Sequence, residues 1–183
     1  MANKKLCTAK TLSWEGRGIW EHDPDDAGGE TFSGITRVFE PGWAGWVKID
    51  GLKAAQIAPT LWKQNTELMA LVDAYYDDLF DRLGLGSLQS DPIASCVFGG
   101  YVNQGPRVIK MFQEAICDAG WSVGTDGRLG PETISTANKA IQGGMSGELA
   151  ILNGLIVKRA RRYVEKSNPK FVAGLLNRLF DGA

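Results

Sequence analysis

The stretch WEGRGIWEHDPDDAGGETFSGIT, residues 14–36, differs from the rest of the chain in its density of glycine and acidic residues. Residues 4–15 carry apolar side chains at helical spacing, and Gly16 is well placed to end that helix. The glycine, aspartate and proline residues that follow predict loops and a small β-hairpin within residues 16–50. A lone glutamate, Glu15, is therefore expected where a helix gives way to a glycine-rich loop.

The position of Glu15 favours the protonated form of its carboxyl group. The negative end of a helix dipole disfavours an ionised carboxylate, and Trp14 and Trp20 offer apolar cover. Both effects raise a carboxyl pKa, which is what a general acid needs in order to hold a proton near neutral pH. The alternative is a surface glutamate in a slightly unfavourable position, and this argument alone leaves it open.

Asp26 is the candidate second carboxylate. It precedes Ala-Gly-Gly, whose glycines permit a tight reversal of the chain back towards Glu15. Two facing carboxyl groups, one protonating a leaving oxygen and the other activating water, carry out glycoside hydrolysis, and the Thr31 hydroxyl would hold that water. Alternatively, Asp26 is a turn residue that bonds its own backbone. The residues alone do not separate the two interpretations.

Outside this stretch the apolar pattern predicts helices. They are expected over residues 52–83, 90–105, 106–119, 131–142, 146–166 and 169–180. Strands are expected only within residues 16–50. The fold class is therefore mainly α, with a minor β-element near the N-terminus.

Composition narrows the class of protein. The chain has 183 residues, 44% of them hydrophobic, and no apolar run approaches the ~20 residues needed to cross a bilayer. The single histidine, His22, would have to serve any Ser-His-Asp or Cys-His site. Three cysteines at unrelated spacings, without a CxxC pair, indicate reduced thiols rather than a zinc site or disulfide framework. We expect no metal and no organic cofactor.

Charge is unevenly spread along the chain. Residues 151–183 carry seven basic residues against two acidic ones. This excess indicates either the solvated face of a helix or attraction to an anionic polymer or membrane surface. Nucleic-acid binding is not expected, because the cluster KRARR (158–162) has no interleaved aromatic residues and no nucleic-acid motif.

Four motifs, in order, resemble the family 108 glycoside hydrolases, which are muramidases that cleave peptidoglycan. The first joins Glu15-Gly16, Asp-Pro-Asp-Asp-Ala-Gly-Gly-Glu-Thr (23–31) and Gly-Ile-Thr (34–36). The others are VNQGPRVIKMFQEAI (102–116), DGRLGPETISTAN (126–138) and RARRYVEKSNPKFVAGLLNRL (159–179). The third of the four resembles the peptidoglycan-binding module that usually follows the catalytic part. The resemblance covers nearly the whole chain.

The resemblance implies a lysozyme-like fold with a catalytic region over residues 1–121 and a packed helical, peptidoglycan-binding-like subdomain over residues 122–183. Glu15 would be the general acid that cleaves the β-1,4 bond between N-acetylmuramic acid and N-acetylglucosamine. Asp26 and Thr31 would position the attacking water.

The stretch also departs from the family pattern. The segment after the catalytic glutamate is longer than usual, and Ala27 replaces the usual proline. Asp23 and Asp25 are therefore rivals of Asp26 for the second carboxylate. Gly99 stands where the family often has an aspartate.

Three further residues are candidates for substrate binding by the same resemblance. Asn103 would bond a sugar acetamide, Tyr101 would flank the same cleft, and Trp20 would offer a sugar platform. Their alternative roles are structural: Asn103 would be a cap or turn residue, and the two aromatic residues would belong to the core.

We expect a monomeric muramidase that acts on peptidoglycan glycan strands. With no secretory leader after the first lysines, it would be made in the bacterial cytoplasm. It would reach the cell wall, in the periplasm or outside, through a phage holin or a secretion system. Two alternatives remain open: a lytic transglycosylase that uses Glu15 alone, and an inactive peptidoglycan-binding protein.

Overall fold

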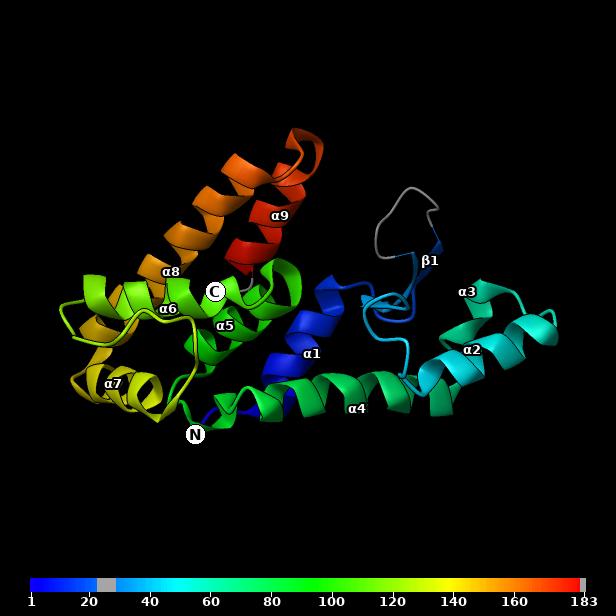
Figure 1. Ribbon diagram of the computed structural model, residues 1–183, viewed down its shortest axis with the longest axis horizontal. Coiled ribbons are helices and arrows are strands. Elements are labelled where there is room, and N and C mark those ends of the chain that lie inside the picture. Colours follow the sequence, from blue (N-terminus) through cyan, green and yellow to red (C-terminus); the bar gives the residue numbers. More distant parts are fainter. Residues whose placement is uncertain (23–28, 182–183) are drawn as a thin grey trace. The chain divides into compact units, whose positions relative to one another are not determined.

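A computed structural model describes residues 1–22 and 29–181 of the chain (Figure 1). The chain forms two compact units, one of residues 12–79 and the other of residues 1–11 together with residues 80–183. The predicted division into a catalytic region over residues 1–121 and a helical subdomain over residues 122–183 stays a prediction. Among the described helices, none is long and apolar enough to cross a membrane.

The unit of residues 12–79 holds a small antiparallel sheet with the strand order β1-β2-β3. Its strands are β1 (Trp20–His22), β2 (Glu30–Phe32) and β3 (Ile35–Thr36). Trp20 pairs with Phe32, and Thr31 pairs with Glu21 on one side and Thr36 on the other. Because side chains alternate along a strand, Thr31 lies on one face of β2 and its neighbours Glu30 and Phe32 lie on the other. The predicted β-element is confirmed.

Three helices complete this unit: α2 (Gly45–Ala54), α3 (Pro59–Trp62) and α4 (Thr66–Arg82), of which residues 66–79 belong to it. The run WVKI (46–49) lies in the segment predicted to hold loops and a small β-hairpin, and that prediction is wrong for this run, which belongs to α2. Trp46 and Ile49 are both buried and are three residues apart, which suits one face of a helix rather than a strand. The helix expected over residues 52–83 is also interrupted. The Asn65 side chain accepts a hydrogen bond from the Leu68 N–H (2.9 Å) and starts α4 afresh.

Aromatic rings form the core between the sheet and these helices. Trp62, only 1% exposed, contacts Phe32 with ring centroids 6.3 Å apart. Phe32 also stacks on Trp43 at 6.4 Å, and Trp43 meets Trp46 edge-on at 5.1 Å. Edge-on and offset contacts are the arrangements that aromatic quadrupoles favour. The rings thereby connect β2 to α2 and α3.

The second unit is helical. Besides parts of α1 (Lys4–Trp14) and α4, it contains η1 (Leu85–Ser87), α5 (Asp91–Gln104), α6 (Arg107–Asp118), α7 (Pro131–Gln142), α8 (Met145–Lys166) and α9 (Pro169–Asp181). Helix α8 packs against α5, α6, α7 and α9 (Figure 1). Helix α7 has its predicted bounds, and the mainly α class is confirmed. The predicted free thiols are confirmed at Cys7, Cys96 and Cys117.

One buried side chain, Gln113 on α6, holds the loop that leads into α7. Its Nε2 lies within hydrogen-bonding distance of Asp126 Oδ1 (2.9 Å), the Arg128 carbonyl (3.0 Å) and Thr133 Oγ1 (3.1 Å). Its Oε1 accepts a hydrogen bond from the Gly127 N–H (2.8 Å). The loop at Asp126 and Gly127 is therefore fixed to α6 by an amide side chain whose donor and acceptor groups both have partners.

Replacing Gln113 by leucine tests this role. The substitution leaves the Gly127 N–H and the Arg128 carbonyl without their partner, so we expect the free energy of unfolding to fall by about 2–4 kcal/mol. Gln142→Leu is the matched control, because the Gln142 side chain donates an exposed hydrogen bond to Gln89 Oε1, and its effect should stay below about 0.5 kcal/mol. Urea unfolding of both variants measures the difference. Equal stability of the two variants would contradict the role given to Gln113.

Candidate active site

Glu15 lies directly after the last residue of α1, as predicted. The helix ends at Trp14, and Gly16 adopts a φ of 68°, in the left-handed region that favours glycine. The Ile19 N–H donates to the Gly16 carbonyl (2.8 Å) and closes the turn. The side chain of Glu15 is half-buried. The end of a helix and a glycine turn thus fix the backbone that carries the predicted acid.

The turn between β2 and β3 lies against Glu15. A Cβ atom added to Gly34 would be 3.2 Å from Glu15 Oε2 and 2.8 Å from the Tyr76 hydroxyl. Both side chains therefore approach the same Cα, and Gly34 is the residue type that lets them do so. Its φ of 78° lies in the left-handed region, which is a second reason why glycine is favoured at this position. The Gly-Ile-Thr motif found in the sequence begins at this contact.

Tyr76, on α4, is the neighbour of Glu15 that sequence reasoning missed. The tyrosine is 1% exposed, and its hydroxyl donates to the Ser33 carbonyl (2.8 Å). Burial, followed by the nearby charge of Glu15, raises the pKa of Tyr76 well above its ordinary value. The phenol therefore remains a neutral hydrogen-bond donor. Tyr76 appeared in the sequence only as one member of an apolar helical stripe, so no local signal marked it.

Thr31 and Trp20 lie on opposite faces of the sheet. Trp20 faces the same side as Phe32, its partner across the strands. Its indole N–H donates to Glu30 Oε1 (2.7 Å), and its ring meets Trp62 edge-on at 5.5 Å. The indole N–H is committed to a protein partner, so any contact of Trp20 with a sugar would use the exposed part of its ring. The half-buried Thr31 points to the other face.

The remaining candidates belong to two other segments of the chain. Asp23, Asp25 and Asp26 lie outside the described residues, in the segment that joins β1 to β2. Tyr101 and Asn103 belong to the helical unit, at the end of α5. Asn103 is exposed, and its Oδ1 accepts a hydrogen bond from the Tyr163 hydroxyl (3.0 Å).

Glu30 forms a second acidic centre that the sequence did not reveal. Its side chain is 10% exposed and lies between two cations, Lys53 of α2 and Arg37. Lys53 donates a hydrogen bond to Oε1, and Arg37 Nε is 2.9 Å from Oε2 without the alignment of a hydrogen bond. Arg37 also pairs with Asp50 (2.6 Å). Glu30 is thereby held as a carboxylate with a structural role.

The pKa of Glu30 follows from these contacts. Burial by itself raises the pKa, but the hydrogen bonds from Lys53 and Trp20 and the charges of Lys53 and Arg37 outweigh it. The net result is a pKa below the ordinary value of 4.5. A carboxyl group with a lowered pKa does not serve as a proton donor near neutral pH. Glu30 is therefore not suited to act as the general acid.

The Glu30 cluster predicts a pH-dependent stability. Because the pKa is lowered in the folded state, the stabilisation is fully present above pH 4.5 and is lost as the pH falls through the folded-state value. We expect Glu30→Gln to lower the free energy of unfolding by about 1–2 kcal/mol near neutral pH, with solvent screening the exposed part of Lys53.

Urea unfolding of wild type and Glu30→Gln at a series of pH values between neutral and 3 measures this effect. The gap between the two proteins should close below pH 4.5. Glu67→Gln, which removes an exposed carboxylate paired with Lys48, is the control and should track wild type. A gap that persists unchanged in acid would contradict the ionic origin of the stabilisation.

Comparisons with known proteins identify the family of the chain. The family described as Glycosyl hydrolase 108 matches residues 8–105, and the family described as Predicted Peptidoglycan domain matches residues 107–180. The solved structure of Brucella abortus SagA shares the fold, with a TM-score of 0.56, 20% sequence identity, and coverage of 97% of this chain and 94% of that chain. No curated protein sequence matches the chain. The resemblance seen in the four motifs is confirmed: the chain belongs to the glycosyl hydrolase 108 family and is a glycoside hydrolase that acts on peptidoglycan.

Proposed function

We propose that the protein is a muramidase that hydrolyses the β-1,4 bond between N-acetylmuramic acid and N-acetylglucosamine, with Glu15 as general acid. The observation that carries this proposal is the position of Glu15. It follows the end of α1, is half-buried, and lies against Gly34 and the neutral hydroxyl of Tyr76. Glu30, a second described acid of the sheet region, is committed to Lys53 and Arg37.

The proposed chemistry has two parts. Glu15 gives its proton to the departing glycosidic oxygen, so that the bond breaks without forming a free alkoxide. A carboxylate in the acidic segment, which we assign to Asp26, takes a proton from water as the water attacks the anomeric carbon. The Thr31 hydroxyl would orient that water. This arrangement inverts the anomeric centre and calls for about 6.5–9.5 Å between the two carboxyl groups.

Glu15→Gln tests the general acid, because glutamine keeps the shape but carries no transferable proton. We expect turnover on purified peptidoglycan to fall by at least about 100-fold, with binding to the insoluble substrate retained. Glu67→Gln serves as the matched control and should keep full activity. Full activity of Glu15→Gln would overturn the assignment.

The masses of the fragments released by the wild type identify the reaction. Hydrolysis adds one water to each cleaved bond, whereas a lytic transglycosylase leaves an anhydro-sugar. Anhydro products would show that the enzyme is a lytic transglycosylase and not a hydrolase. Binding of the wild type without any released fragment would leave only a peptidoglycan-binding protein.

The second carboxylate is tested by three separate substitutions, Asp23→Asn, Asp25→Asn and Asp26→Asn. We expect Asp26→Asn to reduce turnover by about 100-fold or more, as for loss of a general base, and the other two to cost less than about fivefold. Released reducing ends, measured at equal protein concentration, compare the three. A larger loss at Asp23 or Asp25 would transfer the role to that residue.

A further inference from the structure

A basic pocket of the helical unit has no part in the chemistry described above. Its volume is about 210 Å³. The lining residues come from the α5–α6 junction and from the end of α8: Asn103, Gln104, Arg107, Arg162, Tyr163, Lys166 and Ser167. Three of them are cations, and among the described residues that line the pocket none is acidic. We call it the α8 pocket.

The cations of the α8 pocket have no ionic partner in the described part of the chain. Residues 1–22 and 29–180 place no carboxylate within ion-pair distance of Arg107, Arg162 or Lys166. Lys158, two turns earlier than Lys166 on the same helix, shows the contrast, since it pairs with Asp118 (2.9 Å) and Glu114 (3.6 Å). The pocket thus gathers positive charge that the fold itself does not neutralise.

A fourth cation, Arg159, lies buried behind the pocket wall. It is 6% exposed and donates to the Cys96 carbonyl (2.8 Å), Gln104 Oε1 (2.9 Å) and the Tyr163 hydroxyl (3.1 Å). All of these acceptors are neutral. A buried charge without a counter-ion keeps its field, because the protein interior screens it less than water does. Arg159 also locks Gln104 and Tyr163, two of the pocket's polar walls, in place.

The helix dipole explains only some of the cations that line the α8 pocket. Cations in the last turn of a helix stabilise its negative end, which accounts for Lys166 and in part for Arg162. Arg107, by contrast, is the first residue of α6, where the helix dipole disfavours a cation. Its presence there, facing the same hollow, is explained if an anion occupies the pocket.

The size and chemistry of the pocket fit a single carboxylate-bearing group. Guanidinium forks bind carboxylates in a bidentate way, and Asn103 and Ser167 can bond to an adjacent amide. Peptidoglycan carries such groups, since the peptide stems on its glycan strands have free carboxylates and amide bonds. We propose that the α8 pocket binds a carboxylate of a peptidoglycan stem peptide, through Arg107, Arg162 and Lys166. This proposal rests on peptidoglycan being the substrate, and it does not depend on Glu15.

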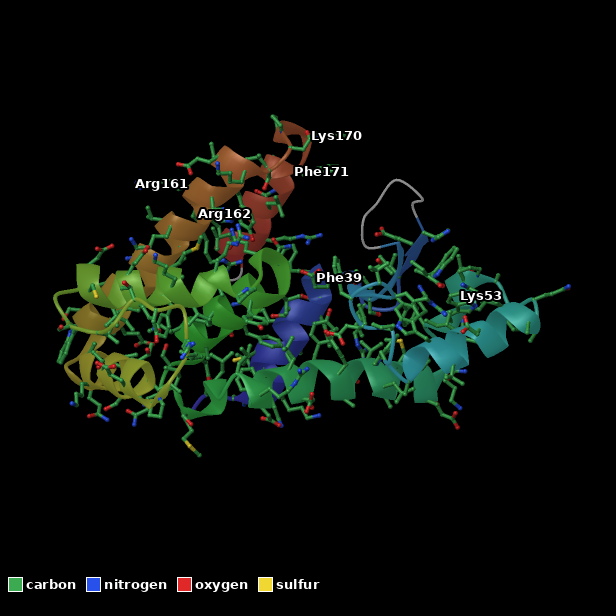
Figure 2. All side chains as sticks on the ribbon, in the orientation of Figure 1. Phe39, Lys53, Arg161, Arg162, Lys170 and Phe171 are labelled. Atoms are coloured by element: carbon green, nitrogen blue, oxygen red, sulfur yellow. The ribbon has the colours of Figure 1, made fainter. Side chains whose placement is uncertain are left out.

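Two adjacent arginines allow a matched test. Arg161 and Arg162 both project from α8 (Figure 2), about 100° apart around the helix axis. Only Arg162 lines the pocket, whereas Arg161 is exposed. Arg162→Gln and Arg161→Gln therefore make the same change of charge on the same helix turn. Neither arginine makes a hydrogen bond or ion pair in the described structure, so both variants should fold, which thermal unfolding checks.

The experiment measures binding of the full-length protein to purified sacculi in the cold, where turnover is slow. Three substrates are compared: intact sacculi, sacculi whose stem carboxylates have been converted to amides, and sacculi stripped of their stems. We expect Arg162→Gln to weaken binding to intact sacculi about fivefold to tenfold and to match wild type on the other two. Arg161→Gln should stay within about twofold of wild type on all three.

Equal binding by the two variants on intact sacculi would overturn the proposal, as would a loss at Arg162 that persists on stripped or amidated sacculi. The double variant Arg107→Gln/Lys166→Gln should repeat the result of Arg162→Gln. Glu15→Gln should bind all three substrates as wild type does. Failure of the pocket proposal is thereby distinguished from failure of the proposed acid.

Discussion

The lack of a side chain at Gly34 is the constraint on which the site of the smaller unit depends. The turn between β2 and β3 has two residues with positive φ, Ser33 (51°) and Gly34 (78°), which suits the right-handed twist of the paired strands. Left-handed backbone is costly for serine, and here hydrogen bonds offset it. The Gly18 N–H donates to Ser33 Oγ (2.8 Å), the Ser33 N–H donates to the Ile19 carbonyl (2.8 Å), and the Tyr76 hydroxyl donates to the Ser33 carbonyl. The turn is thus tied both to α4 and to the segment after Glu15.

This turn joins three parts of the chain that are distant in sequence. The end of α1 supplies Glu15, the hairpin supplies Gly34, and α4 supplies Tyr76. A methyl group at Gly34 would displace at least two of them. The Glu-Gly motif (15–16) and the Gly-Ile-Thr motif (34–36) therefore meet at one contact, between Glu15 and Gly34, which positions the carboxyl group.

The two units treat buried charge in opposite ways. In the unit of residues 12–79, Glu30 is surrounded by two cations and an indole N–H, so its charge is balanced where it lies. In the helical unit, Arg159 donates its hydrogen bonds only to neutral acceptors. The paired charge of Glu30 stabilises the fold, so its removal should lower the free energy of unfolding. The unpaired charge of Arg159 contributes a positive potential to the neighbouring α8 pocket.

Sequence reasoning located the motifs but not the contacts between them. The place of Glu15 at a helix end and the start of α7 at Pro131 were predicted from nearby residues, because caps and proline act locally. The role of Glu15 was implied only by the family resemblance. The run WVKI was misassigned, since a short apolar run fits a strand as well as a buried helix. Tyr76 was missed because its partners Ser33 and Glu15 lie 43 and 61 positions away in sequence. Glu30 was missed because its cations Arg37 and Lys53 come from other parts of the fold, 7 and 23 positions away. Nothing local distinguishes such a tyrosine from any other member of an apolar stripe.

The structure explains the excess of basic residues that the sequence shows over residues 151–183. A solvated helix face accounts for Arg161, which is exposed, and pairing with α6 accounts for Lys158. Neither accounts for cations from two helices that converge on one hollow. Peptidoglycan presents charged stems on glycan strands, and the bond that the enzyme cuts lies in the strand. The proposed contact with a stem carboxylate would give the enzyme affinity from a part of the substrate that does not react.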